Sequence, residues 1–156
     1  MHMTLHSDYS LRVLIALGVA EGRRGTIGAI AAQYGISRNH LMKVCHRLQQ
    51  FGYIETVRGK NGGLRLARDP ASIRVGDVLR DMEPDFELVE CMSAGNQCVI
   101  TRVCRLQHLL AEGLEAFFSS LNRSTLADLL DVGPQLAEAL RPARPLAPGR
   151  RLLRTT

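Results

Sequence analysis

Two short amphipathic helices joined by a glycine turn constrain the fold of this chain more than any other feature of its sequence. The stretch from Thr26 to Tyr34 has helical spacing, and Gly35 follows it where a helix ends with a left-handed residue. Ser37 is a favoured N-cap for a second helix, whose apolar residues keep helical spacing as far as Phe51. A short glycine-containing turn between two such helices predicts a helix-turn-helix motif.

A β-hairpin is predicted directly after the second helix. Residues 53–58 favour a strand, residues 59–63 (GKNGG) favour a tight turn with positive φ, and residues 64–66 alternate as a returning strand. A hairpin with a basic tip in this position is a wing. Residues 1–80, including a first helix that begins near Ser7, are therefore predicted to form a winged helix-turn-helix DNA-binding domain.

The second half of the chain has a different pattern. Residues 75–82 predict a short helix, and residues 85–103 lack periodicity. Leucine and phenylalanine then recur with helical spacing over about four turns from Cys104 to Leu121. Because such an apolar stripe needs a partner, we expect a second copy of the chain to cover it in a symmetric homodimer.

These elements define a mainly α fold class with a small β-hairpin wing, in which the winged helix is joined to a long dimerisation helix. Residues 81–131 contain the cysteine-bearing loop and that helix. Residues 132–156 are rich in proline and arginine and are predicted to form a disordered tail.

Charged residues are segregated along the chain. Residues 1–80 carry 12 basic and 5 acidic residues, residues 81–140 carry 3 and 10, and residues 141–156 carry 5 basic and no acidic ones. A basic module followed by an acidic one is typical of a polyanion-binding domain joined to a domain with another task. Aromatic residues make up only 4% of the chain, which argues against a stacking platform for carbohydrate or single-stranded nucleic acid. This distribution favours double-stranded DNA as the partner.

The outward face of the second helix of the motif carries the candidate DNA contacts. Arginine and lysine side chains can reach guanine edges or phosphates, and asparagine can pair bidentately with adenine. Polar side chains on the wing can reach the DNA backbone or the minor groove. The outward residues of the helix also include Met42, His46 and Arg47. The predicted DNA-binding residues are Ser37, Arg38, Asn39, His40, Lys43, Arg58, Lys60 and Asn61.

The chain lacks the features of an export signal and of a membrane span. The apolar stretch from Leu11 to Ala20 is too short for a span and is interrupted by Arg12. We therefore expect a cytoplasmic protein without membrane contact, in which thiols stay reduced. The cysteines are then buried thiols, metal ligands or redox sensors instead of disulfide partners.

Three of the four cysteines form a separate group. Cys45 falls in the apolar stripe of the second helix, where a thiol packs as a small hydrophobe. Cys91, Cys98 and Cys104 lie on the predicted loop, separated by six and five residues. This spacing lacks the close cysteine pairs of structural zinc sites, whereas soft thiolates on a flexible loop suit an iron–sulfur cluster. A redox-active thiol set and inert cysteines are the alternatives.

A fourth ligand would have to come from a carboxylate or an imidazole. Asp8 lies near the start of the first helix, where an acid is also favoured for structural reasons and can pair with Arg12. His108, one turn after the last cysteine of the loop, is the other candidate.

The sequence carries no pattern typical of catalysis. The phosphate-binding pattern G-x-x-x-x-G-K-[ST], the hydrolase pattern G-x-S-x-G and the metalloprotease pattern H-E-x-x-H are all absent from it. We therefore expect that the protein is not an enzyme. On the residues alone, two other functions stay open: an electron carrier, in which the basic winged half has no role, and a zinc-stabilised or apo interaction module.

Several stretches of the chain resemble one known family. The stretches are Asp8-Tyr9 with Leu11-Arg12, Ser37-Arg38-Asn39-His40, residues 58–63 (RGKNGG), Gly76-Asp77-Val78 with Glu83-Pro84, and residues 124–130 (STLADLL). With its cysteine loop, the chain up to about residue 131 resembles the dimeric winged-helix iron–sulfur repressors of the IscR-like family, and within it the branch that senses nitric oxide.

The resemblance implies a cofactor. Cys91, Cys98 and Cys104 would bind the iron–sulfur cluster, and the acid matching Asp8 would complete a 4Fe-4S cluster from the other subunit. Family members that bind a 2Fe-2S cluster have a histidine three residues after the last cysteine, where this chain has Gln107.

The resemblance also implies a mechanism. A dimer with intact clusters would bind an inverted-repeat operator and repress transcription, until nitric oxide attacks the cluster and the DNA is released. The alternative within the family is an IscR-like regulator that senses iron–sulfur or redox status.

Overall fold

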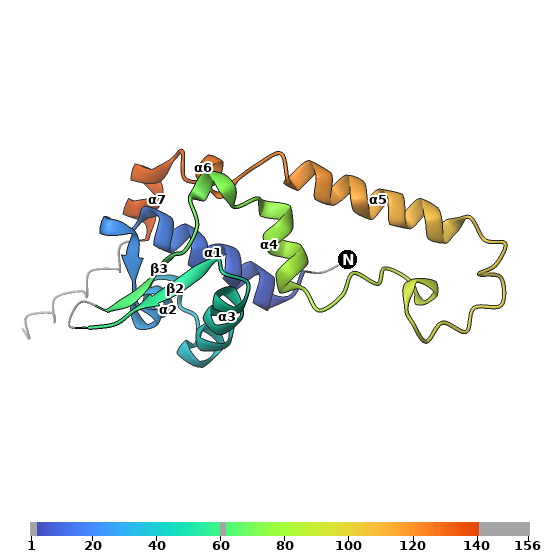
Figure 1. Cartoon of the computed structure of the whole chain (residues 1–156), viewed down its shortest axis with the longest axis horizontal. Helices are drawn as coiled ribbons and strands as arrows, with labels where there is room; N and C mark the ends of the chain where they lie inside the picture. Colours follow the sequence, from blue (N-terminus) through green and yellow to red (C-terminus); the bar gives the residue numbers. More distant parts are fainter. Residues whose placement is uncertain (1–2, 60–61, 141–156) are drawn as a thin grey trace, which may run out of the picture.

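Residues 3–59 and 62–140 of the chain are described in a computed structural model. Over these residues the chain forms helices α1 to α7 and one small antiparallel sheet (Figure 1). Short 3-10 turns connect them: η1 (Glu21–Arg23), η2 (Pro70–Ser72) and η3 (Glu90–Met92).

The three N-terminal helices include the predicted helix-turn-helix motif, which is formed by the second and third of them. The three helices are α1 (Leu5–Val19), α2 (Ile27–Tyr34) and α3 (Arg38–Gln50). Thr26 caps α2 by accepting a hydrogen bond from the Ala29 amide, and Gly35 ends that helix at a φ of 64°. A φ in this range is one that glycine adopts without a steric cost. The predicted helices and the turn between them are confirmed.

The first helix begins earlier than the sequence predicts. Thr4 is its N-cap, and the Thr4 hydroxyl accepts a hydrogen bond from the Ser7 amide at 3.3 Å. Ser7, the predicted start, is instead fully buried in the first turn. Threonine and serine are both favoured N-caps, so the residue type alone does not decide between the two positions.

The wing belongs to a three-stranded antiparallel sheet with the order β1-β3-β2. Its strands are β1 (Arg24–Gly25), β2 (Ile54–Val57) and β3 (Gly63–Leu66). β2 and β3 form the predicted hairpin, with Ile54 opposite Leu66. The sequence does not predict β1, because two residues carry no periodic signal. Gly63 allows β1 to approach, since a Cβ at this position would lie 2.6 Å from the Gly25 carbonyl oxygen.

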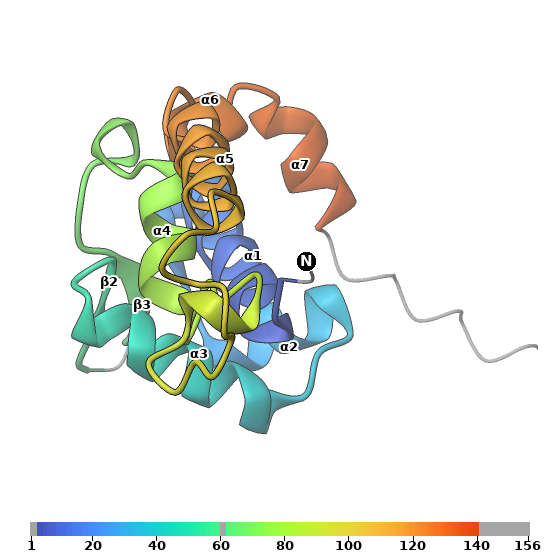
Figure 2. The same cartoon turned by 90° about the vertical axis from the view of Figure 1, so that its right-hand side faces the viewer.

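The second half of the chain covers the side of the winged helix that lies opposite α3. Its helices are α4 (Val75–Met82), α5 (Leu106–Leu121), α6 (Leu126–Leu129) and α7 (Gly133–Ala139). In both views α3 lies at the bottom, α5 and α6 at the top, and α1 and α4 between them (Figures 1 and 2). The segment between α4 and α5, which carries three cysteines, extends beyond the winged helix (Figure 1). The predicted division of the chain near residue 80 stays a prediction.

The first part of the predicted tail is ordered. Residues 133–139 form α7, with Pro134 in the first turn, where proline suits a helix. Leu140 follows α7, is 8% exposed and belongs to the hydrophobic core. The prediction of disorder is therefore wrong for residues 133–140, because an apolar side chain anchors them to the core. The rest of the predicted tail, residues 141–156, lies outside the described residues.

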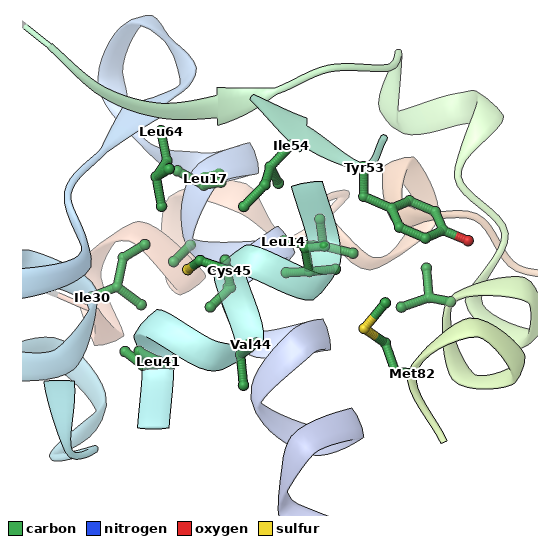
Figure 3. Close-up of a cluster of buried hydrophobic side chains, with 14 of the residues drawn as sticks. Leu14, Leu17, Ile30, Leu41, Val44, Cys45, Tyr53, Ile54, Leu64 and Met82 are labelled. Carbon is green, nitrogen blue, oxygen red and sulfur yellow. The ribbon is translucent and has the colours of Figure 1, made fainter. Parts of the chain in front are cut away.

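One hydrophobic cluster joins the winged helix to parts of the second half (Figure 3). Leu14 and Leu17 of α1 are fully buried in it, and Met82 of α4 is 1% exposed. The apolar stripe of α3 packs into this cluster, except that Phe51, after the helix end, is 38% exposed. The buried residues of α3 are Leu41, Val44, Cys45 and Leu48. Because this stripe fixes α3 against the core, the opposite face of α3 is turned to solvent.

Most of α5 is uncovered in the single chain. Phe118 is its buried residue, and the Arg80 guanidinium lies 4.0 Å from the centre of the Phe118 ring. Leu106 and Leu109 are 51% and 64% exposed, and Val103, just before the helix, is 83% exposed. An apolar surface of this kind is typical of a face that another chain covers. Among the described helices, none has both the length and the apolar character that crossing a bilayer requires.

The variant Leu48→Ala tests the packing of α3. Leu48 is fully buried, so its removal leaves a cavity and is expected to lower the free energy of unfolding by about 2–5 kcal/mol. Met42 lies on the same helix and is 47% exposed, and Met42→Ala is expected to change that free energy by less than about 0.5 kcal/mol. Urea titration followed by circular dichroism measures both. Equal losses in the two variants would contradict the faces assigned to α3.

Candidate functional site

The solvent face of α3 presents polar and basic side chains. Arg38, Asn39 and Lys43 are exposed, and so are Ser37 and His40 at the start of the helix. All five lie outside the buried stripe of α3. The residues that the sequence predicts as helix contacts are therefore accessible to a ligand as large as a DNA duplex.

Arg47 does not belong to this exposed face. Its guanidinium donates two hydrogen bonds to the Asp81 carbonyl oxygen, from Nε at 3.1 Å and from Nη2 at 2.8 Å. Nη2 also lies 3.5 Å from the Glu83 carbonyl oxygen. These carbonyls belong to the C-terminal end of α4, where the helix itself supplies no partners. The interpretation of Arg47 as an outward residue is wrong, because periodicity does not reveal that the C-terminal end of α4 lies within hydrogen-bonding distance of this side chain.

A groove of about 480 Å³ separates α3 from the sheet. Arg38, Met42 and His46 line it from the side of α3, and Thr56 of β2 lines it from the sheet. The Gln49 side-chain amide donates a hydrogen bond to the Thr56 hydroxyl and so links the helix to the wing. This hydrogen bond therefore connects α3 to the wing across one end of the groove.

The wing presents one described candidate contact. Arg58 follows β2 directly and is exposed. The other two predicted wing contacts, Lys60 and Asn61, lie outside the described residues. Gly59 has a φ of 111°, which accords with the tight glycine turn that the sequence predicts.

The four cysteines are free thiols in different surroundings. Cys45 is 2% exposed within the core, as Figure 3 shows, and burial raises the pKa of its thiol to about 11. Cys98 is exposed, whereas Cys91 and Cys104 are half-buried. Only the three loop cysteines are therefore accessible to a metal or to a small molecule.

One hydrogen bond joins the two ends of the cysteine loop. The Gln107 side-chain amide, in the first turn of α5, donates to the Cys91 carbonyl oxygen at 2.7 Å. Cys104 lies just before that turn. Even so, no three His, Cys, Asp or Glu side chains in the described ranges come together closely enough to hold a metal ion. The structure thus places the three cysteines on one accessible loop without gathering their sulfur atoms.

The two candidates for a fourth ligand are both accessible. Asp8 accepts a hydrogen bond from Arg12 Nε on Oδ1 and pairs with Arg12 Nη2 through Oδ2, each at 3.0 Å. The Arg12 guanidinium also lies 5.5 Å from the centre of the Tyr34 ring on α2. His108 is exposed in the first turn of α5. The structural role that the sequence allows for Asp8, an ion pair with Arg12, is therefore present.

A polar junction at the end of α4 is a feature that sequence reasoning misses. The Tyr53 hydroxyl donates to Asp81 Oδ2 at 2.6 Å, and burial and this hydrogen bond raise the Tyr53 pKa, so the hydroxyl stays a donor. Glu83 is 7% exposed, and its Oε1 accepts a hydrogen bond from the Thr4 amide at 2.7 Å. Nearby, burial lowers the pKa of His6. The only sequence signal for this junction is a glutamate before a proline.

The family model that matches this chain is Rrf2, described as an iron-dependent transcriptional regulator, and it spans residues 3–132. The chain belongs to the Rrf2 family. The chain is therefore a transcriptional regulator with a winged-helix DNA-binding fold, as the sequence predicts.

Two curated Rrf2-like relatives are similar over most of the chain. The HTH-type transcriptional regulator NsrR of Bacillus subtilis is 51% identical over 132 residues, which cover 83% of this chain and 90% of that protein. NsrR of Geobacillus kaustophilus is 48% identical over 146 residues, which cover 92% of this chain and 99% of that protein. The predicted identification as a transcriptional repressor of this kind is confirmed, and the relatives are regulators instead of enzymes.

Solved structures show the same fold. IscR of T. potens matches with a TM-score of 0.68 at 23% identity and covers 85% of this chain and 88% of its own. CymR, the global cysteine regulator of B. subtilis, matches with a TM-score of 0.66 at 22% identity and covers 85% of this chain and 98% of its own. The predicted winged-helix fold class is confirmed for this Rrf2 protein.

Thiol labelling tests the contrast between the cysteines. In cluster-free folded protein at about pH 8, iodoacetamide is expected to alkylate Cys98 first, because it is exposed. Cys45 is expected to react only after a denaturant is added, since its thiol is buried and protonated. Peptide mass spectrometry over time measures both rates. Rapid labelling of Cys45 in the folded chain would show that its surroundings are wrongly described.

Proposed function

We propose that this chain is a homodimeric repressor that binds operator DNA with an iron–sulfur cluster in place and releases it in response to nitric oxide. The observation that carries the proposal is the accessible loop with three cysteines, attached through α4 to a winged helix. The identity with relatives named NsrR supports it. Nitric oxide is proposed as the signal because the sequence resembles the nitric-oxide-sensing branch of the IscR-like repressors.

Two elements of the chain would read the operator. Arg38, Asn39 and Lys43 are placed for base edges and phosphates in the major groove, with Ser37 and His40 beside them. Arg58 on the wing is placed for the phosphate backbone. Lys60 and Asn61 would extend the wing contact. The Gln49–Thr56 hydrogen bond, which links α3 to the wing, supports a joint role for the two elements.

The donor set on the loop fits an iron–sulfur cluster. Cys91, Cys98 and Cys104 supply soft thiolates, and each is at least partly accessible for cluster assembly. The Gln107 hydrogen bond to the Cys91 carbonyl keeps the first and last cysteine segments together. Gln107 stands where a histidine would serve a 2Fe-2S cluster, so a 4Fe-4S cluster is the cofactor we propose. When bound, this cluster supplies iron that is reactive toward nitric oxide.

Asp8 would complete the site from the partner subunit. Its carboxylate is on the surface near the start of α1, and a carboxylate is a harder and weaker ligand for iron than a thiolate. In the single chain both of its oxygens interact with Arg12, so iron and Arg12 compete for this carboxylate. His108 is the alternative fourth ligand.

The exposed apolar surface around α5 is where the homodimer would form. Three apolar side chains are exposed here: Val103, Leu106 and Leu109. Their contact with water is unfavourable, so covering them with a second chain would stabilise the protein. A two-fold axis through this surface would place two recognition helices on the two half-sites of an inverted repeat. A contact between α1 of one subunit and the cysteine loop of the other would set the distance between the two recognition helices. Loss of that contact would release the operator.

Substitutions in the two reading elements are expected to have different effects on DNA binding. Asn39→Ala removes a base contact, so it is expected to cost about 1–3 kcal/mol on the operator and little on random DNA. Arg58→Ala removes a phosphate contact, so it is expected to weaken both and to reduce the salt slope by about 1. Fluorescence anisotropy titrations at several salt concentrations measure these values. Equal losses on both kinds of DNA for Asn39→Ala would contradict the assignment.

Cysteine variants test the cluster half of the proposal. Cys98→Ala is expected to abolish the visible absorption of protein reconstituted without oxygen, because it removes one of three thiolates. Cys45→Ala is the matched control and is expected to keep the absorption, since Cys45 lies in the core. Nitric oxide is expected to bleach the control and to lower its operator affinity. A wild-type protein that stays colourless after reconstitution, and whose operator affinity is the same before and after nitric oxide, would exclude the cluster.

A further inference from the structure

We propose that Arg47 is a positioning residue that clamps the recognition helix α3 onto the C-terminal end of α4, so that the cysteine loop controls the orientation of α3. This inference rests on the proposed function, because it names the contact through which the loop acts on operator binding. In it Arg47 touches neither DNA nor the cluster.

The clamp joins α3 to the last residues before the loop. The Arg47 guanidinium reaches the carbonyl oxygens of both Asp81 and Glu83, with its shortest contact at 2.8 Å. Pro84 follows immediately, and Cys91 lies eight residues beyond Glu83. The chain between them contains no helix or strand before η3. A displacement of the cysteine loop therefore reaches the carbonyls that Arg47 holds through a short stretch of chain.

The start of α1 meets the same junction. Glu83 is buried, and its carboxylate accepts the Thr4 amide hydrogen bond at the N-cap of α1. The helix that carries Asp8 and the helix that carries Arg47 are thus both attached to Glu83, one through its side chain and one through its backbone. The junction connects both proposed ligand-bearing segments to α3.

The junction is not fully satisfied in the arrangement that the structure describes. His6 Nε2 is buried and has no hydrogen-bond partner among the described residues. Buried polar atoms are normally paired, so an arrangement of the α4 end that supplies a partner to His6 would compete with the present one.

The length of α3 makes this position effective. Asn39 lies eight residues before Arg47, which is about 12 Å along a helix. The buried stripe of α3 prevents rotation about its axis, so a shift at Arg47 tilts the helix and moves its first turn across the DNA. The clamp would therefore affect base reading more than general attraction to phosphates.

Arg68 provides a matched control. Its guanidinium also donates a hydrogen bond to a carbonyl at the end of α3, that of Phe51, and lies 4.6 Å from the centre of the Tyr53 ring. It links α3 to the residues after the wing, whereas Arg47 links α3 to α4. Arg47→Met and Arg68→Met remove the same charge. Arg47→Met removes the contacts with the Asp81 and Glu83 carbonyls of α4, whereas Arg68→Met removes the contact with the Phe51 carbonyl, so the comparison isolates the tie to α4.

The experiment compares operator affinity of the full chain with and without its cluster, in oxygen-free fluorescence anisotropy titrations. The quantity compared is the operator affinity with the cluster divided by the operator affinity without it. Arg47→Met is expected to reduce this ratio about tenfold relative to wild type, while Arg68→Met keeps the wild-type ratio. Affinity for random DNA and the salt slope are expected to be equal in the two variants. A wild-type ratio in Arg47→Met would overturn the proposal. So would a salt slope reduced by about 1 in Arg47→Met alone, because that result would make Arg47 a phosphate contact.

Hydrogen exchange in cluster-free protein gives an independent readout. The Glu83 amide donates to the Leu79 carbonyl at 3.0 Å, and its exchange is expected to be faster in Arg47→Met than in Arg68→Met. Equal exchange would overturn the clamp. If Arg47→Met does not fold, Arg47→Lys keeps the charge but cannot bridge both carbonyls, and it must show the same loss of the affinity ratio. A wild-type protein without an operator or cluster response would contradict the proposed function, whereas the exchange result would still decide the clamp.

Discussion

The burial of one side of α3 against the core determines what this molecule can present to DNA. Leu41 and Leu48 are fully buried, and Val44 is 1% exposed. Turning α3 about its axis would expose these side chains to water, at a free-energy cost of about 1.5–3 kcal/mol for each. The polar face that carries Arg38 and Asn39 is outward because these three residues are inward. The wing is anchored to the same core, since Ile54 and Leu64 are also buried in it.

α4 connects this rigid reading head to the rest of the chain. On one side its C-terminal carbonyls accept hydrogen bonds from Arg47. On the other side Arg80 lies over the Phe118 ring of α5 and pairs with Glu115 at 2.6 Å. The partly exposed ion pair contributes little stability by itself, whereas the contact with the ring orients α5. The loop between α4 and α5 is therefore connected to the recognition helix through the C-terminal end of α4 and Arg47.

The candidate DNA surface and the candidate cluster site were predictable to different extents. For the DNA surface, helical periodicity identifies the inward residues of α3, and the outward ones follow, except that Arg47 is taken by α4. For the cluster site, the sequence gives the chemistry of Cys91, Cys98 and Cys104 but not their geometry, because the loop has no periodicity. The three sulfur atoms are not gathered in the single chain, and a second subunit and the metal are the partners that the proposed site still needs.

The sequence alone determined the helix-turn-helix with its wing, the separation of Cys45 from the loop cysteines and the family resemblance, because each depends on residue type at a local spacing. Tertiary structure alone decided the short strand β1, the ordered helix α7 and the junction of Glu83 with Thr4 and Arg47. These features join segments that are far apart in the chain. Their hydrogen bonds and packing depend on which backbone groups meet in space, and no local pattern records that.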